Sequence, residues 1–552
     1  MSTPTSATDV VFLHPSDNLF IALRDLPAGA TVTAGGKTVR LTGPVSLGHK
    51  IAIAPIAPNE RAIKFGQTIG FATRPIQPGD WIHTQNLAAG EFHRNYEYAT
   101  EIPAPPTPIT GRTFLGYRRA DGRAATRNYI AVISTVNCSA TVSKAIARHF
   151  DRERLAAFPN VDGVIALTHA TGCGMAIDLL HHQMLDRVMA GFAKHPNIAA
   201  VLIIGLGCEV ATPGHLIKSE NLVQLGLPRV ETGEKVWHGQ AAALGGLPVV
   251  TRHGQTAPSS GLPVPHQPTI PVMSMQDLGG TQKTISRGIE LVHEILPQVN
   301  RTQRTPIPAS EIILGLKCGG SDGNSGITAN PALGIASDRL VAAGGTAVLA
   351  ETTEVYGAEH LLTRRAKNAE VGHKLIERIH WWEWYAKVFG ASIDNNPSPG
   401  NKAGGLTTIY EKSLGAVAKA GSTALNAVYE YAQPIREKGL VLMDTPGFDP
   451  VCVTGMIAGG ANVVCFTTGR GSCFGCKPTP SIKIATNTPM YERMIDDMDF
   501  NAGTILHGAS VEEVGQQIFD LVLEIAGGKK TKSEAMGIGD EEFTPWHLGP
   551  VL

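Results

Sequence analysis

The sequence lacks the marks of several large classes of protein. Only 17% of its 552 residues are charged, and 47 basic residues against 48 acidic ones leave a formal net charge of -1. No bulk field therefore attracts nucleic acid or an anionic membrane. Its eight cysteines are too few for a disulfide scaffold. No apolar run reaches the roughly 18 to 20 residues of a membrane span, so we expect a soluble protein.

The first residues, rich in Ser, Thr and Pro, lack the basic and apolar regions of a signal peptide. We therefore expect a cytoplasmic protein with reduced thiols. Glycine, by contrast, is plentiful. Its 61 residues are about 11% of the chain, against a usual share of about 7%. They stand in short clusters between apolar runs, where tight turns and close backbone approaches are expected.

The pattern along the chain predicts an α/β protein with a small β-rich domain in front. Short β-like runs separated by turn residues fill the first part, and four prolines between residues 101 and 113 indicate an extended linker. Apolar strands then alternate with helical segments, which is typical of mainly parallel sheets with flanking helices. A proline-rich stretch at 252–271 predicts a surface loop. The predicted divisions are 1–95 (β-rich domain), 96–113 (linker), 114–305 and 306–552 (two α/β domains).

Chemically reactive side chains follow many of the predicted strands. The carboxyl ends of parallel strands share one edge of a sheet, where ligands bind. We therefore predict that these residues line one cleft. They are Cys138, His169, Cys173, Cys208, Cys318, Ser321, Asp322, Asn324, Glu351, Glu354, Asp444, Asp449 and Arg470.

The thiols allow two interpretations. A cysteine after a strand is commonly a small buried hydrophobe, and we favour this for Cys138. Cys173, Cys208 and Cys318 stand in glycine-flanked turns beside a histidine or an acid. If the three converge, they would hold a metal or an iron–sulfur cluster with one open iron. The CxxC at 473–476 has no second pair to complete a zinc site.

The glycine-rich turns do not indicate nucleotide binding. CGGSDGNSG lacks the spacing of a P-loop, and GLGCEV lacks that of a dinucleotide fingerprint. Such turns instead let backbone amides approach a carboxylate or a sugar closely.

Several long motifs occur in order along the chain: HPSDN, GHK and KFGQTIGFA near the start, then GYRRADGRAATRN, HATGCG, GLGCE, KCGGSDGNSGITANPALG, NPSPGNKAGG and TTGRGS. Together they resemble the altronate and galactarate dehydratases, a family of sugar-acid hydro-lyases with an N-terminal SAF domain. TNTPMYERMIDDMDFNAG (486–503) and GRGSCFGCKPTPS are more similar to the altronate-type members.

The resemblance implies dehydration of D-altronate to 2-dehydro-3-deoxy-D-gluconate with Fe2+ or Mn2+, an iron–sulfur cluster being the alternative. The proton alpha to a carboxylate is weakly acidic and the β-hydroxyl leaves poorly, so the reaction needs cationic or metal stabilisation, a base and an acid. We assign catalysis to His49, Lys50, His169 and Arg470; substrate binding to Ser321, Asp322, Asn324, Asn401 and Lys402; and metal ligation to His14, Cys173, Cys208, Cys318, Glu351 and Glu354.

In the expected arrangement the N-terminal domain lies over the cleft, so that His14 and His49 close it. We expect a homo-oligomer that acts on a small sugar acid and binds neither nucleic acid nor membrane. The alternatives are a galactarate dehydratase, a lyase for another 2-hydroxy acid, a non-catalytic sugar-acid binding protein and a redox iron–sulfur protein.

Overall fold

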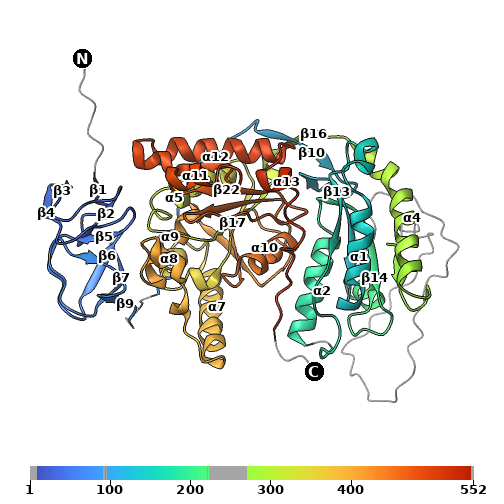
Figure 1. Ribbon diagram of the computed structural model, residues 1–552, viewed down its shortest axis with the longest axis horizontal. Coiled ribbons are helices and arrows are strands. Elements are labelled where there is room, and N and C mark those ends of the chain that lie inside the picture. Colours follow the sequence, from blue (N-terminus) through green and yellow to red (C-terminus); the bar gives the residue numbers. More distant parts are fainter. Residues whose placement is uncertain are drawn as a thin grey trace.

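The computed structural model describes residues 9–548 except 91–93, 95, 178, 221 and 223–269. The chain forms an N-terminal, a second and a C-terminal domain, with the C-terminal domain between the other two (Figure 1). The predicted loop at 252–271 lies outside the described residues apart from its last two. Among the described helices, none is long and apolar enough to cross a membrane.

The N-terminal domain consists of short antiparallel strands, as predicted. One sheet has the order β1-β2-β5-β8, a second has the order β6-β7-β9, and β3 pairs with β4. β2 and β5 are buried along their whole length and place Phe20 and Ile51 in the core, whereas β3 and β4 bury Val32 and Val39 and expose most of their other side chains. The strands are Val10–Val11 (β1), Leu19–Ala22 (β2), Thr31–Ala34 (β3), Lys37–Arg40 (β4), Lys50–Ala52 (β5), Arg61–Lys64 (β6), Gln67–Ala72 (β7), Trp81–Ile82 (β8) and Leu87–Ala88 (β9).

The proline-rich segment after this domain has no regular structure and runs along the C-terminal domain. Its backbone is tied there, since the amide of Ala99 donates to Thr363 O and that of Ile109 to Ala342 O, both at 2.9 Å. Proline has no backbone N–H and favours an extended chain. The segment therefore forms few backbone hydrogen bonds with the C-terminal domain.

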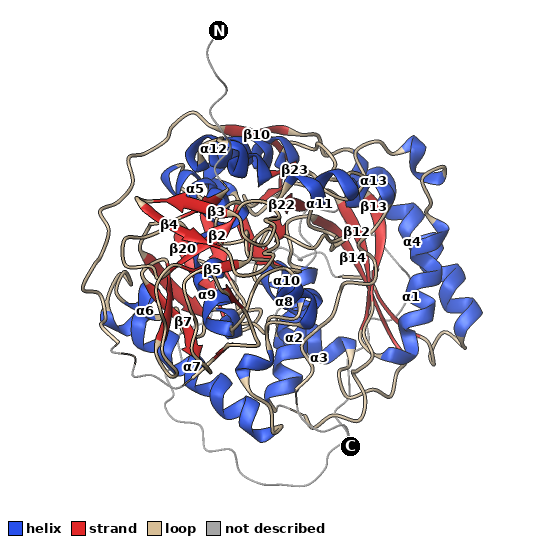
Figure 2. Ribbon diagram, turned by 60° about the vertical axis from the view of Figure 1, so that its left-hand side comes forward, coloured by secondary structure: helices blue, strands red, loops and turns tan. Residues whose placement is uncertain are grey.

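The second domain contains a parallel four-stranded sheet in the order β13-β12-β14-β15. The helices α1 and α4 lie on its outer side (Figure 2), and α2 packs against α10 of the C-terminal domain. The elements are Tyr129–Ser134 (β12), Asn137–His149 (α1), Gly163–Leu167 (β13), Leu180–Ala193 (α2), Ile198–Gly205 (β14), Pro213–Ser219 (α3), Val272–Ser274 (β15) and Thr281–Asn300 (α4).

A small antiparallel sheet, β11-β10-β16, connects the two α/β domains. Its strands are Thr113–Arg118 (β10), Ala124–Ala125 (β11) and Thr305–Pro308 (β16). The chain enters the second domain through β10 and leaves it through β16, so both crossings lie side by side.

The C-terminal domain is built on a seven-stranded parallel sheet in the order β19-β20-β18-β17-β21-β22-β23. The strands are Ile313–Cys318 (β17), Thr346–Leu349 (β18), Leu425–Tyr429 (β19), Gly439–Met443 (β20), Val463–Thr468 (β21), Ser481–Ala485 (β22) and Phe500–Asn501 (β23). The α-helices are Ala329–Ala342 (α5), His360–Thr363 (α6), Ala369–Val388 (α7), Pro399–Ala403 (α8), Ile409–Val417 (α9), Asp449–Ala458 (α10), Thr488–Arg493 (α11), Val511–Ala526 (α12) and Lys532–Met536 (α13).

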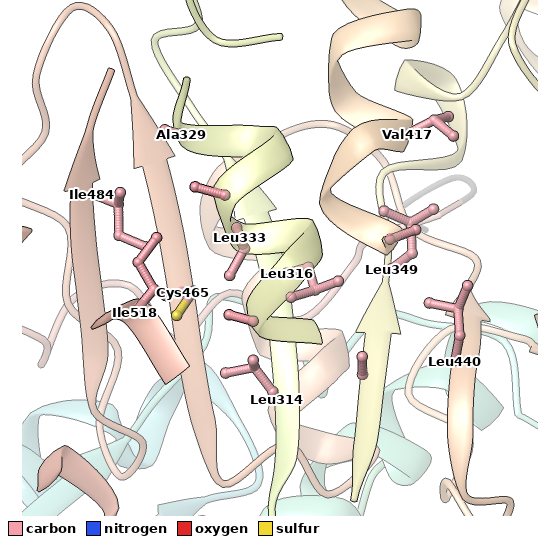
Figure 3. Packing of buried hydrophobic residues seen from close by; sticks show 14 of the residues in the cluster. Leu314, Leu316, Ala329, Leu333, Leu349, Val417, Leu440, Cys465, Ile484 and Ile518 are labelled. Carbon is pink, nitrogen blue, oxygen red and sulfur yellow. The ribbon is translucent and has the colours of Figure 1, made fainter. Parts of the chain in front are cut away.

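Both faces of this sheet are covered. Alternate strand residues such as Leu314, Leu316 and Cys465 pack against α5 and α12 (Figure 3), while Val464 and Phe466 face α10. Burial on both faces explains why the strands are continuous Val, Ile and Leu runs.

A buried ion pair joins the second domain to the end of the chain. Arg127, just before β12, is 1% exposed and binds Glu534 of α13 through two bonds, from Nε to Oε1 at 2.6 Å and from Nη2 to Oε2 at 2.8 Å. Its Nη1 also donates to Ile525 O at 2.9 Å. The ion pair therefore fixes β12 relative to α12 and α13.

We predict that Glu534→Gln lowers the free energy of unfolding by about 3 kcal/mol, because it leaves the Arg127 guanidinium buried without a counter-charge. Glu524→Gln is the matched control, since Glu524 forms an exposed pair with Lys529, and it should cost less than about 0.5 kcal/mol. Chemical denaturation followed by circular dichroism measures both. If the two substitutions lower the free energy of unfolding equally, the Arg127–Glu534 ion pair does not have the stabilising role predicted here.

Candidate active site

Three glycine-rich turns meet where the N-terminal domain contacts the C-terminal domain, and we call this place the glycine junction. The turns are residues 46–49, 319–326 and 400–405. The amide of Gly323 donates to Gly404 O at 2.8 Å. A Cβ on Gly323 would lie 2.1 Å from Gly48 O, and one on Gly405 would lie 2.7 Å from it. Only glycine permits such backbone contact.

Asp322 lies buried in the glycine junction. Its carboxylate accepts bonds from Ser325 Oγ and Thr486 Oγ1 at 3.0 Å and from Asn487 Nδ2 at 3.2 Å. Burial raises its pKa above the ordinary 3.8, although these neutral donors oppose the shift. No lysine or arginine among the described residues forms an ion pair with it.

Four other predicted substrate-binding or catalytic residues surround Asp322. Asn401 donates from Nδ2 to Ser321 O at 2.8 Å. Ser321 Oγ and Asn324 Oδ1 are buried and have no hydrogen-bond partner among the described residues. Arg470 is exposed, and a Cβ on Gly404 would lie 3.2 Å from its Cδ. The structure thus brings these residues together as predicted, with half-buried Lys402 on the same turn as Asn401.

The free space at the junction is small. A cavity of about 10 Å³ is lined by Lys64, Phe65, Ser321, Asp322 and Lys412, among others. That is room for roughly one water molecule.

The two predicted catalytic residues of the N-terminal domain have structural partners. His49 Nδ1 accepts a bond from Trp81 Nε1 at 3.0 Å, and its Nε2 lies 3.4 Å from Ala403 O. Burial lowers the pKa of His49. Lys50 Nζ, fully buried, lies 2.8 Å from Glu411 Oε2, and Lys64 Nζ lies 3.0 Å from the other oxygen of Glu411. These contacts hold the N-terminal domain on the C-terminal one.

Three predicted metal ligands converge at the carboxyl ends of β17 and β18. Cys318 Sγ lies 3.5 Å from Glu351 Oε2 and 3.7 Å from Glu354 Oε2. All three side chains are buried. Glu351 occupies the left-handed region at φ 65°, which turns its carboxylate back toward the strand ends.

Buried lysines already occupy this group. Lys419 Nζ lies 2.8 Å from Cys318 Sγ and 2.6 Å from Glu351 Oε2. Lys317 pairs with the other oxygen of Glu351, and Lys412 Nζ lies 2.8 Å from Glu354 Oε1. We call these three lysines with Cys318, Glu351 and Glu354 the lysine cluster.

The lysine cluster does not suit a divalent metal. Burial alone would raise the pKa of Glu351, but Lys317 and Lys419 outweigh it and lower the pKa to about 2. Lys419 Nζ also lies 2.8 Å from Cys318 Sγ, so an ion bound by this thiol would have to displace the ammonium group. A divalent ion here would also face the ammonium groups that neutralise its ligands. We therefore derive no catalytic step through a metal at this place.

The other predicted metal ligands lie elsewhere, so the expectation of one shared cleft is wrong. Cys173 and Cys208 follow strands of the second domain, whereas Cys318 ends a strand of the other parallel sheet. His14 is exposed, and its Nδ1 accepts from the amide of Ser16 at 3.2 Å. His14 lies beside Gly66, where a Cβ would stand 2.9 Å from its Nδ1.

The second edge holds three exposed thiols, and we call it the thiol edge. Cys138 follows β12, Cys173 follows β13 and Cys208 follows β14. The interpretation of Cys138 as a buried hydrophobe is wrong, because Asn137 and Cys138, the first two residues of helix α1, are exposed.

A pocket of about 550 Å³ adjoins the thiol edge, which is large enough for a sugar acid. It is lined by residues of the second domain and by the end of the chain: Asn137, Ala140, Lys144, Thr168, His169, Ala170, Thr171, Cys173, Gly174, Met175, Glu541, Phe543, Thr544, Pro545 and His547.

His169 is the predicted catalytic residue in this pocket. Its Nδ1 lies 2.8 Å from Thr171 Oγ1 and accepts from the Thr171 amide at 3.2 Å. Its Nε2 is buried and has no hydrogen-bond partner among the described residues. Burial lowers the pKa of His169 to about 4. The ring is therefore neutral at pH 7.

A further ligating group lies on α2 and α3. His215 Nε2 is 3.1 Å from Asp186 Oδ2, and His182 Nε2 is 3.8 Å from the same oxygen. The rings of the two histidines stack at 5.0 Å. The carboxylate is thus shared by two imidazoles.

The sequence interpretation missed the buried cations. Lys64, Lys317, Lys412 and Lys419 are among the most chemically distinctive side chains of the fold, yet they stand in largely apolar stretches of the sequence. A lysine inside a run such as IYEKSLGAVAKA is the available signal, because an unpaired charge does not stay buried.

Family models match almost the whole chain in three consecutive pieces. The altronate/galactarate dehydratase SAF domain covers residues 8–90, the second domain of D-galactarate dehydratase/altronate hydrolase covers 116–300, and the C-terminal domain of D-galactarate/altronate dehydratase covers 309–551. The chain belongs to the D-galactarate/altronate dehydratase family. It is therefore a hydro-lyase.

Individual members of the D-galactarate/altronate dehydratase family align over nearly their full lengths. Galactarate dehydratase (L-threo-forming) of Escherichia coli is 37% identical over 98% of this chain and 96% of its own. Altronate dehydratase of Bacillus subtilis and that of Escherichia coli are each 34% identical over 95% of this chain and 96% of their own.

We predict that Lys50 makes domain docking pH-dependent. Burial lowers its pKa from 10.5 to about 8, in spite of Glu411. Between these values the unfolded chain binds more protons than the folded one, so stability rises with pH. The free energy of unfolding of wild type should rise relative to that of Lys50→Met by up to about 3 kcal/mol from pH 7.5 to 10.5. Parallel profiles of the two proteins in denaturation experiments would refute this.

Proposed function

We propose that this enzyme converts D-altronate to 2-dehydro-3-deoxy-D-gluconate and water in the pocket at the thiol edge. The observation that carries the placement is the buried Nε2 of His169 in the described pocket of sugar-acid size. Because Nδ1 accepts from the Thr171 amide, Nε2 carries the proton of the neutral ring and can donate a hydrogen bond to a substrate oxygen.

The other groups of the pocket suit an anionic substrate. Lys144 and the first residue of α1, Asn137, line it, and a helix N-terminus together with an ammonium group favours a carboxylate. Binding the carboxylate there would stabilise the charge that develops when the proton leaves the neighbouring carbon, and His169 Nε2–H would donate a hydrogen bond to the departing β-hydroxyl. Loss of the β-hydroxyl as water then gives the enol, which becomes the 2-oxo acid.

The choice of altronate rests on the segment 486–503. Its sequence resembles that of altronate-type members, and this resemblance alone supports the choice, because the segment does not line the proposed pocket. The 37% identity to a galactarate dehydratase makes galactarate the competing substrate.

A substrate panel tests this choice. Purified enzyme, reconstituted anaerobically with iron, is incubated with D-altronate, galactarate and other aldonates, and formation of the 2-oxo acid is measured. We expect kcat/KM for D-altronate to exceed that for galactarate at least tenfold, a discrimination of about 1.4 kcal/mol. A higher kcat/KM for galactarate would identify galactarate as the substrate in place of altronate. If no sugar acid yields a 2-oxo acid, the proposed function is refuted.

Variants of His169 and Asp322 decide between the two edges. We expect His169→Gln to lower kcat by about 10² to 10⁴-fold, since it removes the imidazole whose Nε2–H assists departure of the β-hydroxyl. His507→Gln, an exposed histidine, is the control and should keep wild-type kcat. Asp322→Asn should affect stability more than kcat. If instead Asp322→Asn abolishes turnover and His169→Gln does not, catalysis takes place at the glycine junction.

A further inference from the structure

The three turns that carry the thiols are locked to one another. The amide of Asn137 donates to Thr171 O at 3.0 Å, and the amides of Val210 and Ala211 both donate to Gly172 O at 3.1 Å. Each of the three cysteines stands within two residues of one of these bonds. Their backbone positions are thus fixed relative to each other, although they come from three separate strands.

Glycine shapes this packing. Gly172 has φ 94°, and a Cβ there would lie 2.2 Å from Thr135 O, in the turn before α1. Gly174 and Gly207 also have positive φ, 66° and 125°. The thiols of Cys173 and Cys208 therefore stand in turns of the kind whose backbone amides form concave anion sites, including those around iron–sulfur clusters.

The third thiol has a different source of positive potential. Cys138 is the second residue of the 13-residue helix α1, whose N-terminus has no side-chain cap and no acidic residue in its first turn. A helix N-terminus stabilises a thiolate. All three thiols are exposed. Gln276 Nε2 donates a weak hydrogen bond to Cys208 Sγ at 3.4 Å.

The chemistry of the pocket leaves a role unfilled. Its titratable lining residues are Lys144, His169, Cys173, Glu541 and His547. Glu541 is exposed and paired with Lys144, so the described lining offers no buried carboxylic acid to assist His169 in the departure of the β-hydroxyl. A Lewis acid beside His169 would serve instead.

We propose that Cys138, Cys173 and Cys208 hold a 4Fe–4S cluster whose fourth iron has no cysteine ligand and faces the pocket of His169. Thiolates are the ligands that iron–sulfur clusters require. When bound, such a cluster would supply Lewis-acid polarisation of a substrate oxygen through its open iron. The three ligands differ from the predicted set, because Cys318 belongs to the lysine cluster and Cys138 takes its place. This inference rests on the proposed function, whose site it completes.

The test uses the full-length protein, purified anaerobically and reconstituted with iron and sulfide. We expect about four iron and four acid-labile sulfide per chain, with visible charge-transfer absorption. Cys138→Ser, Cys173→Ser and Cys208→Ser should each lose at least half of the iron and sulfide while keeping the far-ultraviolet circular dichroism of wild type. Cys473→Ser, an exposed thiol outside the thiol edge, is the matched control and should retain both.

Further measurements separate the alternatives. Iron without sulfide would overturn the cluster in favour of a mononuclear site, and loss of that iron in His215→Ala would place it at the group on α2 and α3. Retention of the full complement in all three serine variants would also overturn the proposal.

Dehydration is measured in the same preparations. If cluster-free protein dehydrates the substrate, the proposed role of the cluster in the reaction is refuted, but the proposed function is not. A cluster in a protein that dehydrates no sugar acid would refute the function but not the cluster.

Discussion

The double ion pair of Glu411 with Lys50 and Lys64 fixes the arrangement on which the rest of the N-terminal half depends. All three charges are buried. Replacing any one of them by a neutral side chain should lower the free energy of unfolding by about 3 to 5 kcal/mol. The N-terminal domain therefore docks in one orientation. That orientation presses Gly48 against Gly323 and Gly405, and it leaves the carboxylate of Asp322 enclosed behind the contact.

Buried charges also compensate one another inside the C-terminal domain. Lys317, Lys412 and Lys419 and the carboxylates of Glu351 and Glu354 compensate each other at the ends of β17 and β18. The cluster is a set of acids and a thiol that would attract a metal if the lysines were absent. Because they are present, its chemistry differs from that of the thiol edge, where three sulfurs stand without a buried cation.

Each parallel sheet thus presents its own strand-end edge. The edge of the seven-stranded sheet is closed by the N-terminal domain and has space for about one water, whereas that of the four-stranded sheet opens on a pocket of about 550 Å³. A reacting sugar acid needs room as well as polar groups, and the larger pocket is the reason why we propose the second domain as the place of the chemistry.

The sequence by itself determined the order of the domains, the parallel sheets and the family, because strand periodicity, turn residues and long motifs are local properties. It also identified Ser321, Asp322, Asn324 and Asn401 as neighbours, since they follow one strand or occupy one conspicuous turn. Only the tertiary structure decided that Cys318 is separated from Cys173 and Cys208, that Cys138 is exposed, and that Lys50 is an ion-pair residue. These outcomes depend on which strand ends share a sheet and on which buried charges meet, and such contacts join residues hundreds of positions apart.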